Sequence, residues 1–221
     1  MVKFPEGIPS PHSARQSLET TPFSYTEPAP FMHLYHADFD GQALIDAVEV
    51  DGENTNWGMG VVGSKGHSRY SKHRDSRSKN LFNEVEKSFK NSDSDSFTEL
   101  QKAAYDVLYH AERAVWNYRL TYGLDYIRES QGWVINKYGH GGQYKVHTDQ
   151  GTGDPRIISC VIYLNTVEDG GDTVFPFQNA VSKCIAGNIL VFPSSYIYAH
   201  ASTPTGSNSE EVKYGMAGFF I

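Results

Sequence analysis

The sequence has few cysteines, no long hydrophobic run and no excess of basic charge. Its two cysteines among 221 residues, Cys160 and Cys184, stand in apolar runs typical of buried strands, so we expect packed thiols in a reducing, cytoplasmic setting. Apolar residues never run together for membrane-spanning length, and residues 1–10 lack the apolar stretch of a signal peptide, which argues against membrane insertion and secretion. The net charge of −7 argues against nucleic-acid binding, because phosphate binding depends on Lys and Arg.

The first part of the chain divides into an arm and several short elements. Residues 1–30 are rich in Pro, Ser and Thr and show little periodicity, so they are predicted to form an arm, and residues 31–221 have the length of one domain. Strands are predicted for Phe31–His36 and Trp57–Val62. A short helix is predicted between them, from apolar residues on one stripe: Leu44, Ile45, Ala47 and Val48.

The stretch from Gly63 to Asn80 is strongly basic. It holds six Lys or Arg residues against the single acidic Asp75, and it has too few apolar groups to contribute core. Two interpretations stay open. The stretch is either a solvated loop or a lid that orders over an anionic or peptide substrate.

Two helices are predicted after this stretch. Leu81–Phe89 has apolar residues at helical spacing. A longer helix begins at Ser96, which forms an S-x-x-E capping box with Glu99, and it is long enough to support a sheet. Its apolar face consists of Leu100, Ala103, Val107, Ala111, Ala114 and Tyr118.

Beyond Gly123 the sequence becomes typical of strands. Short runs rich in Val, Ile, Tyr and Phe alternate with Gly, Asp, Asn and Pro, which predicts a sandwich or barrel. In one run, Ile157–Leu164, one face is wholly apolar and should pack on the helices, whereas Ser159 and Tyr163 on the other should face a cavity. The predicted strands are Trp133–Tyr138, Tyr144–His147, Ile157–Leu164, Thr173–Phe175, Ile189–Phe192, Tyr196–His200 and Lys213–Phe220.

Three side chains in this region suggest a metal site. His147 and Asp149 are two residues apart, so on a strand they project to the same face. Alone, this pair is weak evidence for a metal site, because such a tripeptide also arises by chance and as a surface ion pair. His200 at the end of a later strand completes two histidines and one carboxylate, the facial set that binds non-haem Fe(II) and leaves coordination positions open.

Lys213 is a further candidate binding residue. On the last predicted strand it shares a face with Gly215 and Ala217, so its ammonium would project among small residues into the barrel. Burial without a counter-anion would be costly. The alternative is a strand lysine that faces solvent.

An ordered set of motifs now resembles the 2-oxoglutarate- and Fe(II)-dependent dioxygenases of the prolyl 4-hydroxylase type: YGHGGQYKVHTD, RIISCVIYLNTVEDGGDTVFP and AGNILVFP, followed by His200 and Lys213. The match is dense over Trp133–Phe220 and only loose upstream. It implies a mainly β (α+β) dioxygenase domain. Residues 130–221 would form a double-stranded β-helix, or jelly roll, and the helices of residues 31–129 would pack on its larger sheet.

The resemblance also implies roles for individual residues. His147, Asp149 and His200 would be the iron ligands and the catalytic centre. Lys213 would pair with the distal carboxylate of 2-oxoglutarate, and Tyr163 would hydrogen-bond the same end.

Further residues would surround this centre. Tyr138 and Thr173 would contact the cosubstrate, and Arg156 would line the peptide groove. Trp133 is one of several aromatic residues on which an extended proline-containing peptide would dock. The others are Tyr144, Tyr196 and Tyr198.

The implied reaction is oxidative decarboxylation of 2-oxoglutarate to succinate and CO₂, coupled to hydroxylation of a C–H bond. The cofactors implied are Fe(II), 2-oxoglutarate and O₂, with ascorbate as reductant. The implied partner is a peptide or protein containing proline, with no nucleic acid and no membrane.

One departure from the family pattern affects Lys213. The segment after His200 is a few residues longer than usual, and a longer hairpin at Gly206–Glu211 would absorb the excess. Two rival functions stay open: the same chemistry on a lysyl residue, a free amino acid or an alkylated base, and a jelly roll that only binds a ligand.

Overall fold

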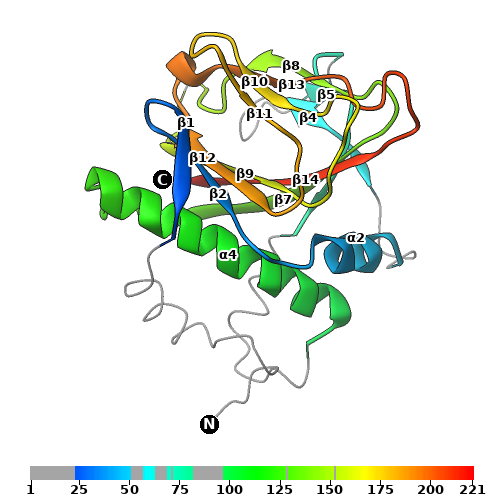
Figure 1. The fold of residues 1–221 in the computed structure, drawn as a ribbon, viewed down its shortest axis with the longest axis horizontal. Helices are drawn as coiled ribbons and strands as arrows, with labels where there is room; N and C mark the ends of the chain where they lie inside the picture. Colours follow the sequence, from blue (N-terminus) through cyan, green and yellow to red (C-terminus); the bar gives the residue numbers. More distant parts are fainter. Residues whose placement is uncertain are drawn as a thin grey trace.

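Two facing antiparallel sheets, with helices on the outside of the larger one, make up the computed structural model of the chain (Figure 1). The structure describes residues 23–50, 57–62, 69–70, 72–81, 97–127, 129–151 and 153–221. Among these residues no helix is long and apolar enough to cross a membrane.

The larger sheet has eight strands. His147 and His200 lie outside it, on a four-stranded sheet, and a separate two-stranded sheet pairs β4 (Val61–Val62) with β5 (Arg69–Tyr70). In spatial order, the large sheet contains β1 (Tyr25–Ala29), β2 (Met32–His36), β12 (Asn188–Pro193), β9 (Ile158–Tyr163), β14 (Lys213–Phe220), β7 (Ser130–Tyr138), β6 (Arg77–Asn80) and β3 (Gly58–Met59). The small sheet contains β11 (Ala180–Ser182), β10 (Thr173–Phe175), β13 (His200–Ser202) and β8 (Tyr144–His147).

Helices α2 (Gly41–Val50) and α4 (Glu99–Tyr122) lie on the outer face of the large sheet (Figure 1). The predicted division of the strand around residues 157–164 agrees with this arrangement. Its apolar face, which includes Cys160 and Ile162, lies in the core shared with α4, whereas Tyr163 belongs to a second core between the sheets. The large sheet is therefore covered on both faces, by the helices on one side and by the small sheet on the other, and a pocket lies between the two sheets.

The start of α4 differs from the prediction. Thr98, rather than Ser96, is the N-cap: its side chain accepts a hydrogen bond from the Gln101 backbone N–H, and the Gln101 side-chain oxygen accepts one from the Thr98 backbone N–H. A T-x-x-Q box can satisfy the same free N–H groups as the expected S-x-x-E box, and the two overlap in this sequence. The helix expected at residues 81–89 falls almost wholly outside the described residues.

Two other predictions need correction. Residues 25–29 are not part of an arm but form β1, the edge strand paired with β2. Tyr196–Tyr198 forms a short 3₁₀ helix, η2, because turn hydrogen bonds connect Tyr198 to Ser195 and Ala199 to Tyr196. Only His200 from that predicted strand lies in β13.

The basic stretch contributes structure where it is described. Residues 77–80 pair with β7 of the large sheet, and Arg74 bridges to Tyr144 at the end of the small one. The described part from 72 to 80 thus links β8, at the edge of the small sheet, to β6 of the large sheet, unlike a solvated loop. Closure over a substrate stays a prediction.

Candidate metal centre and cosubstrate pocket

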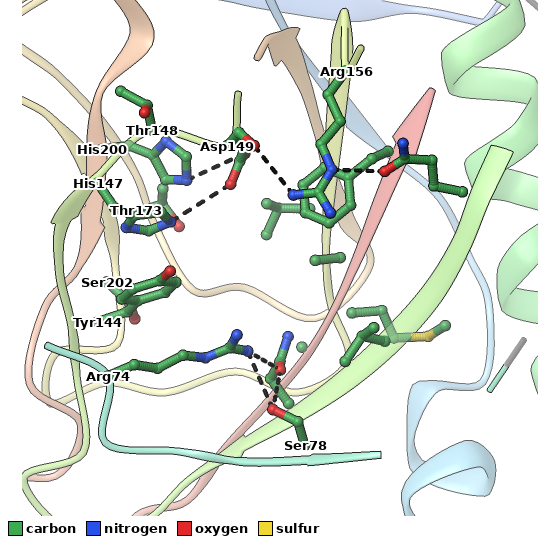
Figure 2. Close-up of a pocket in the computed structure, with 18 of the residues that line it drawn as sticks. Arg74, Ser78, Tyr144, His147, Thr148, Asp149, Arg156, Thr173, His200 and Ser202 are labelled. Atoms are coloured by element: carbon green, nitrogen blue, oxygen red, sulfur yellow. Dashed lines mark hydrogen bonds and ion pairs between the residues drawn. The ribbon is translucent and has the colours of Figure 1, made fainter. Parts of the chain in front are cut away.

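A cavity of about 1660 Å³ lies between the two sheets. Its walls carry most of the residues singled out in the sequence, and Figure 2 shows the metal-site side chains pointing into it from the small sheet. Among the predicted site residues, those that line it are His147, Asp149, His200, Lys213, Tyr138, Thr173 and Arg156.

His147, Asp149 and His200 converge at one end of the cavity. Their ligand atoms lie within 4.8 Å of one another, and each histidine Nε2 is 3.6 Å from a different oxygen of the Asp149 carboxylate. The pairing of the strands explains this convergence, because His147 on β8 is directly opposite His200 on β13.

Backbone carbonyls fix both imidazole rings. The Nδ1 of His147 lies 2.9 Å from the Lys145 carbonyl oxygen, and the Nδ1 of His200 lies 3.0 Å from the Tyr198 carbonyl oxygen. Because a carbonyl can only accept, each Nδ1 carries the proton and each Nε2 lone pair is left for a metal.

A β-bulge brings Tyr144 to the same face as His147. Four residues of β8, from Tyr144 to His147, are matched by three of β13, from Ser202 to His200. Lys145 and Val146 therefore both face outward, and the Tyr144 ring stacks on the His147 imidazole with 3.4 Å between centroids and 12° between planes.

The electrostatics of the three groups favour an ionised carboxylate and a neutral imidazole. Burial acts to raise the pKa of Asp149, but the imidazoles of His200 and His147 outweigh it and hold that pKa well below its usual range. Burial lowers the pKa of His200. These are the protonation states that a metal ligand requires.

Lys213 begins β14 and faces the small sheet across the pocket. The residue is 3% exposed, and its Nζ donates to the Gly171 carbonyl at 2.5 Å and to the Ser202 hydroxyl at 2.9 Å. The ring centroids of Tyr138 and Tyr163 are 5.3 and 5.4 Å away. No carboxylate of the described residues forms an ion pair with Lys213, and burial lowers its pKa.

A row of hydroxyl groups crosses the small sheet beside Lys213. Ser202, Thr173 and Ser182 are directly opposite one another on β13, β10 and β11, so they share a face, and all three are buried. The Tyr163 hydroxyl donates to Thr173 Oγ1 at 2.8 Å from the large sheet. Ser182 Oγ is buried without a hydrogen-bond partner in the part of the chain described.

Two predicted substrate residues behave differently from one another. The Arg156 guanidinium lines the pocket, where it donates to Gln131 Oε1 at 2.7 Å and to the Asp149 carbonyl at 3.1 Å and lies over the Phe219 ring. Trp133 does not line the pocket. It is 4% exposed and packs edge-on against Phe220 on the helix side of the sheet. Alternation along β7 explains this position, because it places Trp133 on the opposite face from Asn136 and Tyr138, which line the pocket.

The other suggested aromatic residues also differ. Tyr144 lines the pocket, whereas Tyr196 is 72% exposed on η2 and the Tyr198 hydroxyl donates to the Pro30 carbonyl. Arg74 and Ser202 also line the pocket, although neither was predicted from the sequence to be a site residue. Ser202 could have been found, since it is two residues after His200 on one strand.

The residues fit an iron ion and a dicarboxylate cosubstrate. Two neutral imidazoles and one carboxylate form the donor set of a facial Fe(II) site. A buried ammonium without a carboxylate partner in the described part of the chain is suited to an anionic group. The longer segment after His200 does not displace Lys213, because residues 203–212 form an irregular loop anchored to Asp169 and Glu168.

Comparison with known proteins agrees with this geometry. Residues 133–221 match the family model described as the 2OG-Fe(II) oxygenase superfamily. No curated protein matches the chain. The resemblance to the 2-oxoglutarate- and Fe(II)-dependent oxygenases is therefore confirmed for the part of the chain that carries the motifs.

Solved prolyl hydroxylases share the fold at low sequence identity. One from Trichoplax adhaerens, in complex with a peptide fragment of the hypoxia inducible factor oxygen degradation domain, has a TM-score of 0.60 at 14% identity, covering 95% of this chain and 89% of that one. A Pseudomonas putida prolyl-4-hydroxylase has a TM-score of 0.58 at 15% identity, and the match covers 95% of this chain and 97% of that one. A viral collagen prolyl hydroxylase from Paramecium bursaria Chlorella virus-1 has a TM-score of 0.55 at 16% identity, and the match covers 86% of this chain and 95% of that one. The predicted jelly roll is confirmed.

Proposed function

We propose that the protein is a 2-oxoglutarate- and Fe(II)-dependent dioxygenase that hydroxylates proline residues in a peptide or protein. The observation that carries the proposal is the placement of His147, Asp149 and His200 on one wall of a cavity whose other wall presents the buried Lys213. A jelly roll that only bound a ligand would not need both groups.

Bound Fe(II) would supply oxidation by O₂, coupled to decarboxylation of 2-oxoglutarate. The chain itself supplies binding and orientation. His147, Asp149 and His200 would hold the metal with both Nε2 atoms directed to it. The Lys213 ammonium would hold the distal carboxylate of the cosubstrate, and the Tyr163–Thr173 hydrogen bond would set the position of the hydroxyls beside it.

Two features support a peptide substrate. The cavity of about 1660 Å³ exceeds what a small cosubstrate fills, which leaves room for a polypeptide segment. A structural neighbour is a prolyl hydroxylase bound to a peptide fragment, and an extended proline-containing segment loses little entropy when it docks. Arg156 at the pocket wall and the Tyr144 ring offer polar and aromatic contacts.

The test is incubation of the protein with Fe(II), 2-oxoglutarate, O₂ and peptides that contain proline or lysine, alongside free amino acids. A mass gain of one oxygen on a proline, with stoichiometric succinate, is expected. A mass gain of one oxygen on lysine or on a free amino acid would refute prolyl specificity but would still support 2-oxoglutarate-dependent hydroxylation. Ascorbate is expected to sustain turnover as a reductant, and a parallel reaction without ascorbate tests this expectation.

Asp149→Ala should abolish turnover and weaken metal binding, because it removes the only carboxylate of the ligand set. The control is Asp46→Ala, which removes an exposed carboxylate from α2. Succinate production and circular dichroism should be measured for both variants. Full turnover in Asp149→Ala would exclude this metal site.

A further inference from the structure

Arg74 belongs to the pocket wall and joins the two sheets. Its backbone forms an antiparallel bridge with Tyr144, the first residue of β8. Two flanking backbone hydrogen bonds of 2.8 Å hold this segment against the free edge of the small sheet. The backbone of Arg74 is thus fixed to the strand that carries His147.

The side chain of Arg74 is held by the opposite sheet. Its Nε donates to Ser76 Oγ at 3.0 Å, and one terminal nitrogen donates to Ser78 Oγ at 3.2 Å and to the Asn136 side-chain oxygen. Ser78 and Asn136 are paired residues of β6 and β7. Figure 2 shows Arg74 and its contact with Ser78 at the lower wall of the pocket.

The guanidinium of Arg74 lies over a ring that touches a metal ligand. Its Cζ is 4.9 Å from the Tyr144 centroid, and the same ring stacks on the imidazole of His147. The bulge in β8 is what places Tyr144 and His147 on the same face. The three side chains therefore form a continuous stack from the large sheet to the metal site.

We propose that Arg74 is a positioning residue for the metal centre, because it presses the Tyr144 ring against the His147 imidazole and so fixes the direction of the Nε2 lone pair. The proposal rests on the proposed function in one respect, namely that a metal binds to His147. The stack of side chains itself is present in the metal-free protein. The carbonyl bonded to Nδ1 restrains one edge of the imidazole, and Tyr144 restrains its face. Together they leave His147 one orientation.

Metal binding tests the proposal with Co(II), whose visible absorption reports both affinity and coordination geometry. Arg74→Ala should bind Co(II) roughly 10-fold more weakly, the effect typical of losing a partner that orients a metal ligand. Arg74→Lys should fall between, because it keeps the cation over the ring and loses the planar hydrogen-bonding fork. The matched control is Arg77→Ala, which removes an exposed arginine from the same segment and should bind like wild type.

A second measurement uses the metal-free protein. The ring protons of His147 lie against the face of Tyr144, so their NMR signals should be shifted upfield by its ring current, and Arg74→Ala should reduce that shift. The signals are assigned by their loss in His147→Gln. Wild-type shift and wild-type Co(II) affinity in Arg74→Ala would overturn the proposal. Wild-type protein that bound no Co(II) would refute the metal site instead, and the NMR shift would still decide the role of Arg74.

Gly60 offers a variant that keeps Arg74 itself. An added Cβ at this position would lie 2.8 Å from Arg74 Nε and even closer to Ser76 Oγ, so Gly60→Ala must displace the guanidinium. It should reduce the His147 shift and the Co(II) affinity in the same direction as Arg74→Ala. Melting curves establish that each variant is folded, and an unchanged stack in a folded Gly60→Ala protein would contradict the role assigned to Arg74.

Discussion

The single residue with the most unusual surroundings is Lys213, a buried ammonium whose hydrogen bonds go to neutral oxygens. Its environment lowers its pKa, so the charge is held at an energetic cost that an anionic ligand would offset. The position of this residue is thus better explained by binding than by stability.

Lys213→Ala should raise the apparent constant for 2-oxoglutarate by roughly 10- to 1000-fold, because it removes a charge-assisted contact from a largely dry pocket. Metal binding should persist. Lys183→Ala is the control, since that lysine is exposed and pairs with Asp172. Steady-state kinetics with varied cosubstrate, plus metal titration, measure both effects. An unchanged constant would show that the anchor is elsewhere.

At this scale the sequence predicted local relations well. His147 and Asp149 converge as strand alternation predicts, although Asp149 lies just beyond the end of β8. Alternation along β9 also places Tyr163 on the side of the small sheet, but in the core between the sheets rather than in the pocket wall. Arg74 could not be found this way, because its place depends on pairing with Tyr144, a residue far along the chain, and on a bulge that no local pattern marks.

Among the elements, β2 and α4 are joined by a buried polar cluster. His33 is 0% exposed, and its two ring nitrogens hydrogen-bond the hydroxyls of Tyr35 at 2.8 Å and Tyr122 at 3.0 Å. The Tyr25 ring of β1 stacks on the imidazole. Burial lowers the pKa of His33 to about 4, although Glu27 opposes this.

This cluster predicts acid sensitivity. The unfolded chain binds a proton to His33 near pH 6.5, and the folded protein does so only near pH 4, so stability is present above pH 6.5 and lost as pH falls toward 4. The loss is on the order of 3 kcal/mol. The free energy of unfolding of His33→Gln should fall less steeply over this range, whereas His36→Gln, an exposed control on the same strand, should follow wild type. Parallel curves for all three proteins would exclude His33 as the source.

Element prediction succeeded where β-branched and apolar runs were continuous, as in β9 and β12. It missed β1, with sequence YTEPA, because its polar residues and proline are unfavourable for a strand and only pairing with β2 at the sheet edge stabilises it. Tyr196–Tyr198 has strand-like residues but adopts turn hydrogen bonds, since tertiary context overrides a weak β preference.

In the whole molecule, the two kinds of binding group are divided between the sheets. The metal ligands His147 and His200 are on the small sheet, whereas Lys213 and Tyr163 are on the large one. The sequence placed these strands in one fold but did not indicate which sheet each belongs to, because sheet assignment depends on long-range pairing.

This division predicts coupling between metal and cosubstrate. A cosubstrate that spans the cavity would touch both walls, so Mn(II), used in place of Fe(II), should tighten 2-oxoglutarate binding by roughly 10-fold, and the reciprocal effect must be equal. Calorimetric titration in each order of addition measures it, with Asp149→Ala expected to abolish the coupling. Independent binding of the two in wild-type protein would contradict a shared site.

The pairing of strands also sets how long each wall of the pocket stays closed. β14 is hydrogen-bonded to β7 on one side and β9 on the other, whereas β8 ends the small sheet and has β13 as its one strand partner among the described elements. Backbone amides of β14 should therefore exchange with deuterium only on global unfolding, and those of β8 through local opening. A bound metal would then dissociate when β8, which carries His147, opens locally, while the end of the pocket at Lys213 stays folded.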